Sequence, residues 1–212
     1  MSAAHTGMNA PENSSGHPAR PASASEGDIN LSGRMFAFEH YGVLPDVVVL
    51  GKGLGGGIMP LAAVLASEKL NVAGKQSLGH YTHEKNPVAC AAALATLRVI
   101  RDENLVDRAK TLGEMALREL SSLARNQALI GEVRGLGLLL GIELVQDHEA
   151  LQPANAEAER VMYECLRRGL NFKVTMGNIL TLTPALTVSE GELRLAFSIL
   201  QESIAKTAAA AG

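Results

Sequence analysis

The chain has 212 residues, a formal net charge of −3 and a hydrophobic fraction of 47%, values typical of a globular protein large enough to bury a substantial core. The slight negative charge excludes a strongly basic nucleic-acid-binding protein. An aromatic content of only 3%, without Trp, argues against stacking on single-stranded nucleic acid. No apolar run approaches the roughly 18 residues of a membrane-spanning helix. Two cysteines are too few for a disulfide framework and indicate a reducing, cytoplasmic setting.

Residues 1–30 differ in composition from the rest of the chain. They are rich in Ala, Ser, Gly and Pro and show no apolar periodicity. Such a segment buries too little apolar surface to offset the entropy that it would lose on ordering. It also lacks the continuous apolar region of a secretory signal peptide. We therefore expect residues 1–30 to be disordered.

Strands and helices alternate after this segment. The β-branched run at residues 46–50 and the run at residues 61–67 each follow a proline and predict two strands. A helix is predicted at residues 87–103, because proline is favoured in the first turn of a helix. Residues 105–124 place their apolar side chains on one stripe and predict an amphipathic helix.

The C-terminal part of the chain combines short strands with two further helices. The predicted elements are a glycine-punctuated hairpin or bent strand pair at 130–145, a helix at 154–168 followed by Gly169, strands at 170–174 and 178–183, and a helix that opens with a capping box of Ser189 and Glu192. This succession of elements predicts an α/β fold with an α+β C-terminal part.

A glycine-rich turn, GKGLGGG at residues 51–57, follows the first predicted strand. Its spacing does not fit a phosphate-binding P-loop. The G-x-G-x-x-G pattern of dinucleotide-binding proteins is present, but Pro60 and a strand-like run replace the helix that must follow it. The third interpretation is a nucleophilic lysine: Lys52 stands at the end of a buried strand, where its amine can form a Schiff base. The alternative is a lysine that extends from a turn into solvent.

Four segments in order carry a resemblance to one family. Residues 33–67 (GRMFAFEHYGVLPDVVVLGKGLGGGIMPLAAVLAS) closely resemble the active-site segment of class III aminotransferases, which are pyridoxal-phosphate enzymes of fold type I. The family motif H-G-x-T-[FY]-x-x-N-P occurs as GHYTHEKNPV at residues 79–88. VRGLGLLLGIEL at 133–144 and NILTLTPAL at 178–186 match later motifs of the family.

The resemblance implies a fold, a cofactor and site residues. It implies part of a fold type I large domain, with its linking helix, at residues 31–124, and a small α+β domain at residues 125–212. Lys52 would bind pyridoxal 5'-phosphate as a Schiff base and act as the catalytic lysine. Thr82 would contact the phosphate of the partner subunit's cofactor, which implies a homodimer. The implied reaction transfers an amino group from an amine or amino acid to a keto acid or aldehyde.

The chain also departs from the family pattern. Family members are longer, and the acidic segment whose aspartate pairs with the pyridine nitrogen is expected directly before Ser32 but is missing there; Asp28 is out of register. We interpret the abrupt junction as a truncated, rearranged or misframed gene, with residues 1–30 unrelated to the family. An inactive fragment is therefore one alternative to an active enzyme.

A second departure concerns the substrate. Thr181 stands where many family members have an arginine that binds the substrate carboxylate. A hydroxyl cannot neutralise a carboxylate, which favours an ammonia- or phospho-lyase on an aminophosphonate or phosphoamine as the alternative function. The segment at residues 79–88 also resembles relatives that act as ammonia-lyases on hydroxy-aminoethylphosphonate. Lys173 is either a replacement contact for an anion or an exposed strand lysine.

Three other groups have candidate roles. We expect Arg134 to make a structural ion pair or a cap rather than to contact the substrate. We expect Cys90 to lie in the core rather than to act in catalysis. The residues His80, His83 and Glu84 have the composition of a metal site. The resemblance places them in a phosphate-binding loop instead, so we expect no metal.

Overall fold

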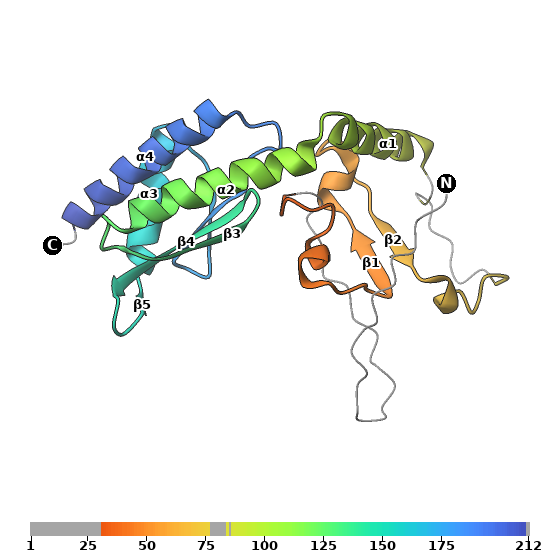
Figure 1. Cartoon of the computed structure of the whole chain (residues 1–212), viewed down its shortest axis with the longest axis horizontal. Helices are drawn as coiled ribbons and strands as arrows, with labels where there is room; N and C mark the ends of the chain where they lie inside the picture. The colour runs from red at the N-terminus through yellow and green to blue at the C-terminus, as the bar shows by residue number, and fades with distance from the viewer. Residues whose placement is uncertain (1–30, 77–83, 85, 211–212) are drawn as a thin grey trace, which may run out of the picture.

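The computed structural model describes residues 31–76, 84 and 86–210, which form two lobes joined by a long helix (Figure 1). We call residues 31–102 the N-terminal lobe and residues 105–210 the C-terminal lobe. The predicted disorder of residues 1–30 falls outside the described residues. Among the described helices, none has the length and apolarity needed to cross a bilayer.

The N-terminal lobe contains a two-stranded antiparallel sheet. Strands β1 (Val47–Leu50) and β2 (Ala63–Ala66) confirm the two predicted strands and pair with each other. Three short 3-10 helices surround them: η1 (Ala37–Tyr41), η2 (Lys52–Gly55) and η3 (Glu68–Leu70). Two paired strands bury little apolar surface by themselves, so this sheet depends on the helix beside it.

That helix, α1 (Pro87–Asp102), begins as predicted. The side chain of Asn86 caps it by accepting a hydrogen bond from the Val88 amide at 2.9 Å. Ala89 and Ala93 are buried one turn apart on the face toward the lobe. Cys90 points away from this face and is exposed, so the prediction that it lies in the core is wrong.

The C-terminal lobe contains an antiparallel sheet in the order β3-β4-β7-β6, with β5 paired to β4. Its strands are β3 (Ile130–Leu136), β4 (Leu139–Asp147), β5 (Gln152–Pro153), β6 (Lys173–Thr175) and β7 (Ile179–Leu182). Of the two alternatives predicted for residues 130–145, the hairpin is confirmed: it is formed by β3 and β4. The first of the two later strands begins a few residues after its predicted start.

Helices α2 (Leu105–Ala124), α3 (Asn155–Arg167) and α4 (Glu190–Ala209) complete the C-terminal lobe. All three match predicted helices, and the Ser189–Glu192 capping box is confirmed. The helices and the alternate residues of the strands form one apolar core. Its fully buried aliphatic members include Leu120, Leu138, Leu140, Ile142, Leu144, Val161, Leu180, Leu200 and Ile204.

Helix α2 packs closely on the β3–β4 turn. A Cβ atom on Gly113 would lie 2.1 Å from the carbonyl oxygen of Gly137, and one on Gly137 would lie 2.3 Å from the carbonyl oxygen of Leu31. The Leu138 amide donates to that same Leu31 oxygen at 2.7 Å. The start of the N-terminal lobe is thereby fixed to the C-terminal lobe. The predicted boundary between residues 124 and 125 assigns α2 to the N-terminal domain, whereas its buried side chains pack in the C-terminal core. The position of this domain boundary remains a prediction.

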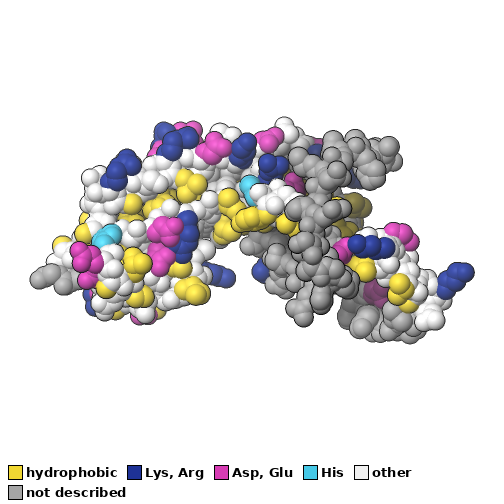
Figure 2. All heavy atoms as spheres, turned by 60° about the horizontal axis from the view of Figure 1, so that its bottom comes forward, with side chains coloured by type: hydrophobic (Ala, Val, Ile, Leu, Met, Phe, Trp, Pro, Cys, Tyr) yellow, Lys and Arg dark blue, Asp and Glu magenta, His cyan; other side chains and the backbone are white. Residues whose placement is uncertain are grey.

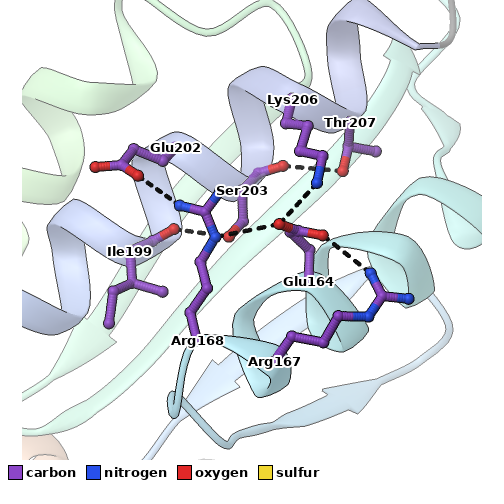
Figure 3. A network of polar contacts seen from close by, with 8 residues as sticks. All are labelled: Glu164, Arg167, Arg168, Ile199, Glu202, Ser203, Lys206 and Thr207. Carbon is purple, nitrogen blue, oxygen red and sulfur yellow. Dashed lines mark hydrogen bonds and ion pairs between the residues drawn. The ribbon is translucent and has the colours of Figure 1, made fainter.

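A group of charged residues joins α3 to α4 (Figure 3). The Glu164 carboxylate accepts hydrogen bonds from Lys206 at 2.9 Å, Arg167 at 3.0 Å and Arg168 at 3.1 Å. Arg168 also bridges to Glu202 on α4. These contacts, led by the hydrogen bond from Lys206, lower the pKa of Glu164 below its ordinary value of 4.5.

We expect Glu164→Gln to lower the free energy of unfolding at pH 7, because the change leaves three cations without their shared carboxylate. A carboxylate whose pKa is lowered by folding stabilises the fold above its unfolded pKa and loses that effect as the pH falls. The difference from wild type should therefore shrink below about pH 4.5. Urea unfolding followed by circular dichroism at several pH values measures it.

The matched control is Glu119→Gln, since Glu119 pairs with Arg194 on the surface, where such pairs contribute little. Equal urea midpoints for wild type and Glu164→Gln at pH 7 would contradict this account of the α3–α4 contact.

Candidate functional site

The candidate catalytic lysine lies in the turn that connects β1 to β2. Gly51 is extended at the end of β1, and Lys52 then adopts a φ of 43°, in the left-handed region. The Leu54 amide donates to the Gly51 oxygen at 3.0 Å, and the Gly56 amide donates to the Gly53 oxygen at 3.0 Å. The turn leads into a strand, not a helix. This geometry agrees with the rejection of a dinucleotide-binding turn.

Gly56 allows the turn to pass close to α1. It has a φ of 69°, and a Cβ atom there would lie 2.8 Å from the Thr96 hydroxyl. That hydroxyl is held by the Ala92 carbonyl at 2.9 Å. Around Gly53, by contrast, the space within 4 Å of an added Cβ is empty. The glycines therefore serve two purposes: contact with α1 and free access beside the lysine.

An open hollow of about 540 Å³ lies beside Lys52. It is lined by Val49, Leu50, Gly51, Lys52, Pro60, Leu61 and Ala62. The lysine amine is the only ionisable group among these described residues. The hollow therefore fits one requirement of pyridoxal phosphate, a lysine amine on a surface of small and aliphatic groups. Among the described lining residues there is no carboxylate for a pyridine nitrogen and no aromatic ring.

A second hollow, of about 690 Å³, lies where the glycine-rich turn faces α1. Gly53, Gly55 and Gly56 line it together with residues of α1 and with Ala185 and Leu186, which follow β7. Hydrophobic side chains reach the surface at the junction of the two lobes (Figure 2). The chain that leaves β7 is therefore brought next to the turn that carries Lys52.

The other predicted cofactor contact is not placed. Thr82 lies outside the described residues, as do His80 and His83. Within residues 31–76, 84 and 86–210, no cluster of His, Cys, Asp and Glu has the arrangement of a metal site. The roles of residues 79–88 stay predictions.

Three residues discussed from the sequence lie in one row across the C-terminal sheet. Arg134 on β3 is opposite Gly141 on β4, which is opposite Thr181 on β7, which is opposite Lys173 on β6. Side chains at opposed positions project from the same face of a sheet. The apolar residues directly beside them on each strand point into the core beneath the helices. This row therefore lies on the opposite face of the sheet, the open face, which no helix of the described residues covers.

The ion pair predicted for Arg134 is confirmed. Its guanidinium donates to Glu132 and Glu143, each at 2.6 Å. The hydrogen bond to Glu143 is the main cause that raises the pKa of Arg134, and in return it lowers the pKa of Glu143. This arginine is thereby neutralised by two carboxylates of its own sheet.

A contact that the sequence analysis missed lies at the other end of the row. The Thr175 hydroxyl lies 2.8 Å from the Thr181 hydroxyl. The signal available in the sequence was the short Thr-Met-Gly segment between the two predicted strands. In the structure Met176 and Gly177 both have positive φ, which fits a tight hairpin. That hairpin fixes the register that brings the hydroxyls together.

Comparison with known proteins supplies the family. The model of the family described as aminotransferase class-III matches residues 29–204. The (R)-1-hydroxy-2-aminoethylphosphonate ammonia-lyase of Vibrio splendidus is 45% identical over 84% of this chain and 37% of its own length. Ornithine aminotransferase 1 of Staphylococcus saprophyticus is 35% identical over 84% of this chain and 42% of its own length.

A solved structure gives the same result. The amine transaminase of an uncultivated Pseudomonas species, in its PLP-bound internal aldimine form, matches with a TM-score of 0.78 and 34% identity, covering 84% of this chain and 42% of that one. The chain thus spans well under half the length of these relatives. Since the family model covers most of its residues, the chain belongs to the class III aminotransferase family and contains part of that family's fold.

Proposed function

We propose that this chain belongs to a pyridoxal-phosphate-dependent aminotransferase that moves an amino group from an amine or amino acid to a keto acid or aldehyde. Lys52 is the residue that binds the cofactor. The observation that carries this proposal is the position of Lys52, between two glycines at an open hollow, in a backbone conformation that disfavours lysine.

The backbone conformation supports a functional role for the amine. At a φ of 43°, glycine avoids the clash that any residue with a Cβ incurs. Strained positions of this kind persist where function requires the side chain. A lysine that only extended into solvent would gain nothing from this conformation.

The chain's own residues account for part of the chemistry. When bound, pyridoxal phosphate withdraws electrons from the substrate carbon that bears the amino group. The Nζ atom of Lys52 would hold the cofactor and, as a free amine, would itself accept the proton from that carbon. Gly51 would admit a flat ring close to the backbone, and Val49 and Leu61 supply an apolar wall beside it.

The cofactor's phosphate and the assembly enter the proposal through residues 79–88. We assign Thr82 as a hydroxyl donor to the phosphate of the neighbouring subunit's cofactor, in a homodimer. The support is the match of GHYTHEKNPV to the family motif. A cytoplasmic location is part of the same proposal, supported by two free cysteines, Cys90 and Cys165.

A second candidate function is an ammonia-lyase that acts on an aminophosphonate. Two observations favour it. The relative from Vibrio splendidus, which is 45% identical, carries that activity in its name. By its resemblance to the family motif, NILTLTPAL also has Thr181 where many members have a carboxylate-binding arginine, and the neutral Thr181 hydroxyl contacts Thr175. Both candidates share Lys52 and the same cofactor.

Borohydride reduction tests the role of Lys52. The 212-residue chain is incubated with pyridoxal phosphate and reduced, and the added mass is located by peptide mapping. We expect stoichiometric label on Lys52, because reduction makes a Schiff base permanent. Lys52→Arg should remove the label, whereas Lys75→Arg, at an exposed lysine of the same lobe, should retain it. Label scattered over several lysines would refute the assignment.

The backbone strain gives an independent prediction. Lys52→Gly should be more stable than Lys52→Ala by about 1 kcal/mol, because only alanine brings a Cβ into the left-handed region. Urea unfolding measures the difference. At Lys75, which has no positive φ, glycine should instead be no more stable than alanine. Equal stability of the two Lys52 variants would contradict the strain argument.

Dependence on an acceptor separates the two candidate functions. With L-ornithine or 1-hydroxy-2-aminoethylphosphonate as the amine, an aminotransferase makes alanine only when pyruvate is present. A lyase releases ammonia from the phosphonate without pyruvate. We expect the first result. Ammonia release without pyruvate would replace it with the second candidate, and neither product would refute both for this chain.

A further inference from the structure

We propose that Lys173, Thr175 and Thr181 form a binding site for the phosphonate or phosphate group of the substrate, on the open face of the C-terminal sheet. The inference rests on the proposed function only for the statement that this group belongs to an amine substrate. The site itself is argued from the geometry of β6 and β7.

The strand register gathers the three side chains. Lys173 is paired with Thr181, and Thr175 is paired with Ile179, two residues before Thr181. Residues two apart on a strand share a face, so Lys173 and Thr175 project on the same side as Thr181. Val174 and Leu180, between them, pack into the core on the opposite side.

The two hydroxyls are arranged to serve an anion. They lie 2.8 Å apart, and one donates to the other. Each hydroxyl can rotate and carries one proton. An oxyanion placed above them can therefore accept a hydrogen bond from both, with the loss of one contact between hydroxyls. The ammonium group of Lys173 adds up to three donors on a flexible stem.

The charged residues of the row that runs from Arg134 to Lys173 favour Lys173 as the contact for an anion. Arg134, at the far end, is held by Glu132 and Glu143. Lys173, by contrast, forms no ion pair with a carboxylate in the described part of the chain. Gly141, between them, places no side chain over the sheet. On the surface of the C-terminal lobe, basic side chains lie beside acidic ones (Figure 2); within the row, Lys173 is the cation that a bound anion could still pair with.

The shape of the donor set favours a tetrahedral anion. A planar carboxylate is matched best by the planar fork of an arginine. The ammonium group and the two hydroxyls come from adjacent strands and do not lie in one plane, so they match a planar carboxylate poorly. Each of them can instead donate to a different oxygen of a tetrahedral phosphonate. The replacement of arginine by Thr181 thus changes the preferred anion rather than removing anion binding.

The site lies on β6 and β7, and the segment that follows β7 comes next to the turn that carries Lys52. After Thr181, the chain leaves β7 at Leu182 and reaches Ala185 and Leu186, which line a hollow with Gly53 and Gly55. A substrate with an amino group at one end and a phosphorus oxyanion at the other has partners of matching chemistry on both elements. Lys52 would take the amino end, and Lys173 would take the anion.

Nuclear magnetic resonance titration of the 15N-labelled chain, without cofactor and at low ionic strength to limit screening, tests the proposal. The probes are methylphosphonate, inorganic phosphate and acetate. We expect saturable shifts of the Lys173, Thr175 and Thr181 amides with both phosphorus oxyanions, and weaker binding of acetate. Lys173→Gln should weaken methylphosphonate binding by about tenfold or more, as for loss of a charged hydrogen-bond donor.

Lys110→Gln, at an exposed lysine of α2, is the matched control and should bind like wild type. Lys52→Arg should also bind methylphosphonate normally, so failure of the trapping experiment would leave this result intact. Thr181→Val should weaken phosphorus oxyanions more than acetate. The proposal is overturned if Lys173→Gln binds as tightly as wild type, if the shifts map to other residues, or if no probe causes a saturable shift.

Discussion

Helix α2 can lie against the β3–β4 turn only because neither Gly113 nor Gly137 has a side chain. A Cβ atom on Gly113 would stand only 2.1 Å from the carbonyl oxygen of Gly137, too close for the two atoms to coexist. The same turn receives the hydrogen bond between Leu138 and Leu31. One close contact therefore sets the position of the helix, of the sheet below it and of the segment that begins the N-terminal lobe.

The two lobes joined in this way are stabilised very unequally. The C-terminal lobe has a continuous apolar core between three helices and a four-stranded sheet path. The apolar cluster at the centre of the N-terminal lobe contains three buried residues, Leu50, Leu54 and Ala93. Val64 and Leu65 on β2 are more than half exposed. Lys52 thus lies in the lobe that gains less from hydrophobic burial, which makes its contacts with α1 and with residues 185–186 important for its position.

The chemistry of the chain is likewise divided between the lobes. The glycine turn presents an amine, and the open face of the C-terminal sheet presents a second amine with two hydroxyls. The short segment after β7, which includes Ala185 and Leu186, connects the open face of the sheet to the hollow beside the glycine turn. Binding at two sites holds a substrate in a fixed orientation, and a catalytic group gains most when the reacting atom is already held beside it. Lys52 and Lys173 have the same side chain, but the surroundings of each predict a different use.

Short-range patterns in the sequence were sufficient to predict the local elements and to single out Lys52. Proline at the start of α1, the capping box at Ser189 and the glycine after α3 each act within one turn of helix, so they could be recognised without knowledge of the fold. The strand before Lys52 and the glycines around it left two interpretations open, and the family resemblance decided between them; the role of Lys52 stays a prediction. The family resemblance rested on these contiguous segments.

Contacts between residues far apart in the chain could be seen only in the folded structure. The hydroxyl contact of Thr175 with Thr181 and the neutralisation of Arg134 by Glu143 depend on strand register, which joins positions that no local pattern connects. The exposed position of Cys90 followed from which face of α1 turned toward the lobe, and an alanine-rich helix does not encode that choice strongly. The strain at Lys52 was also invisible in the sequence, because backbone dihedral angles are set by how the turn packs against α1.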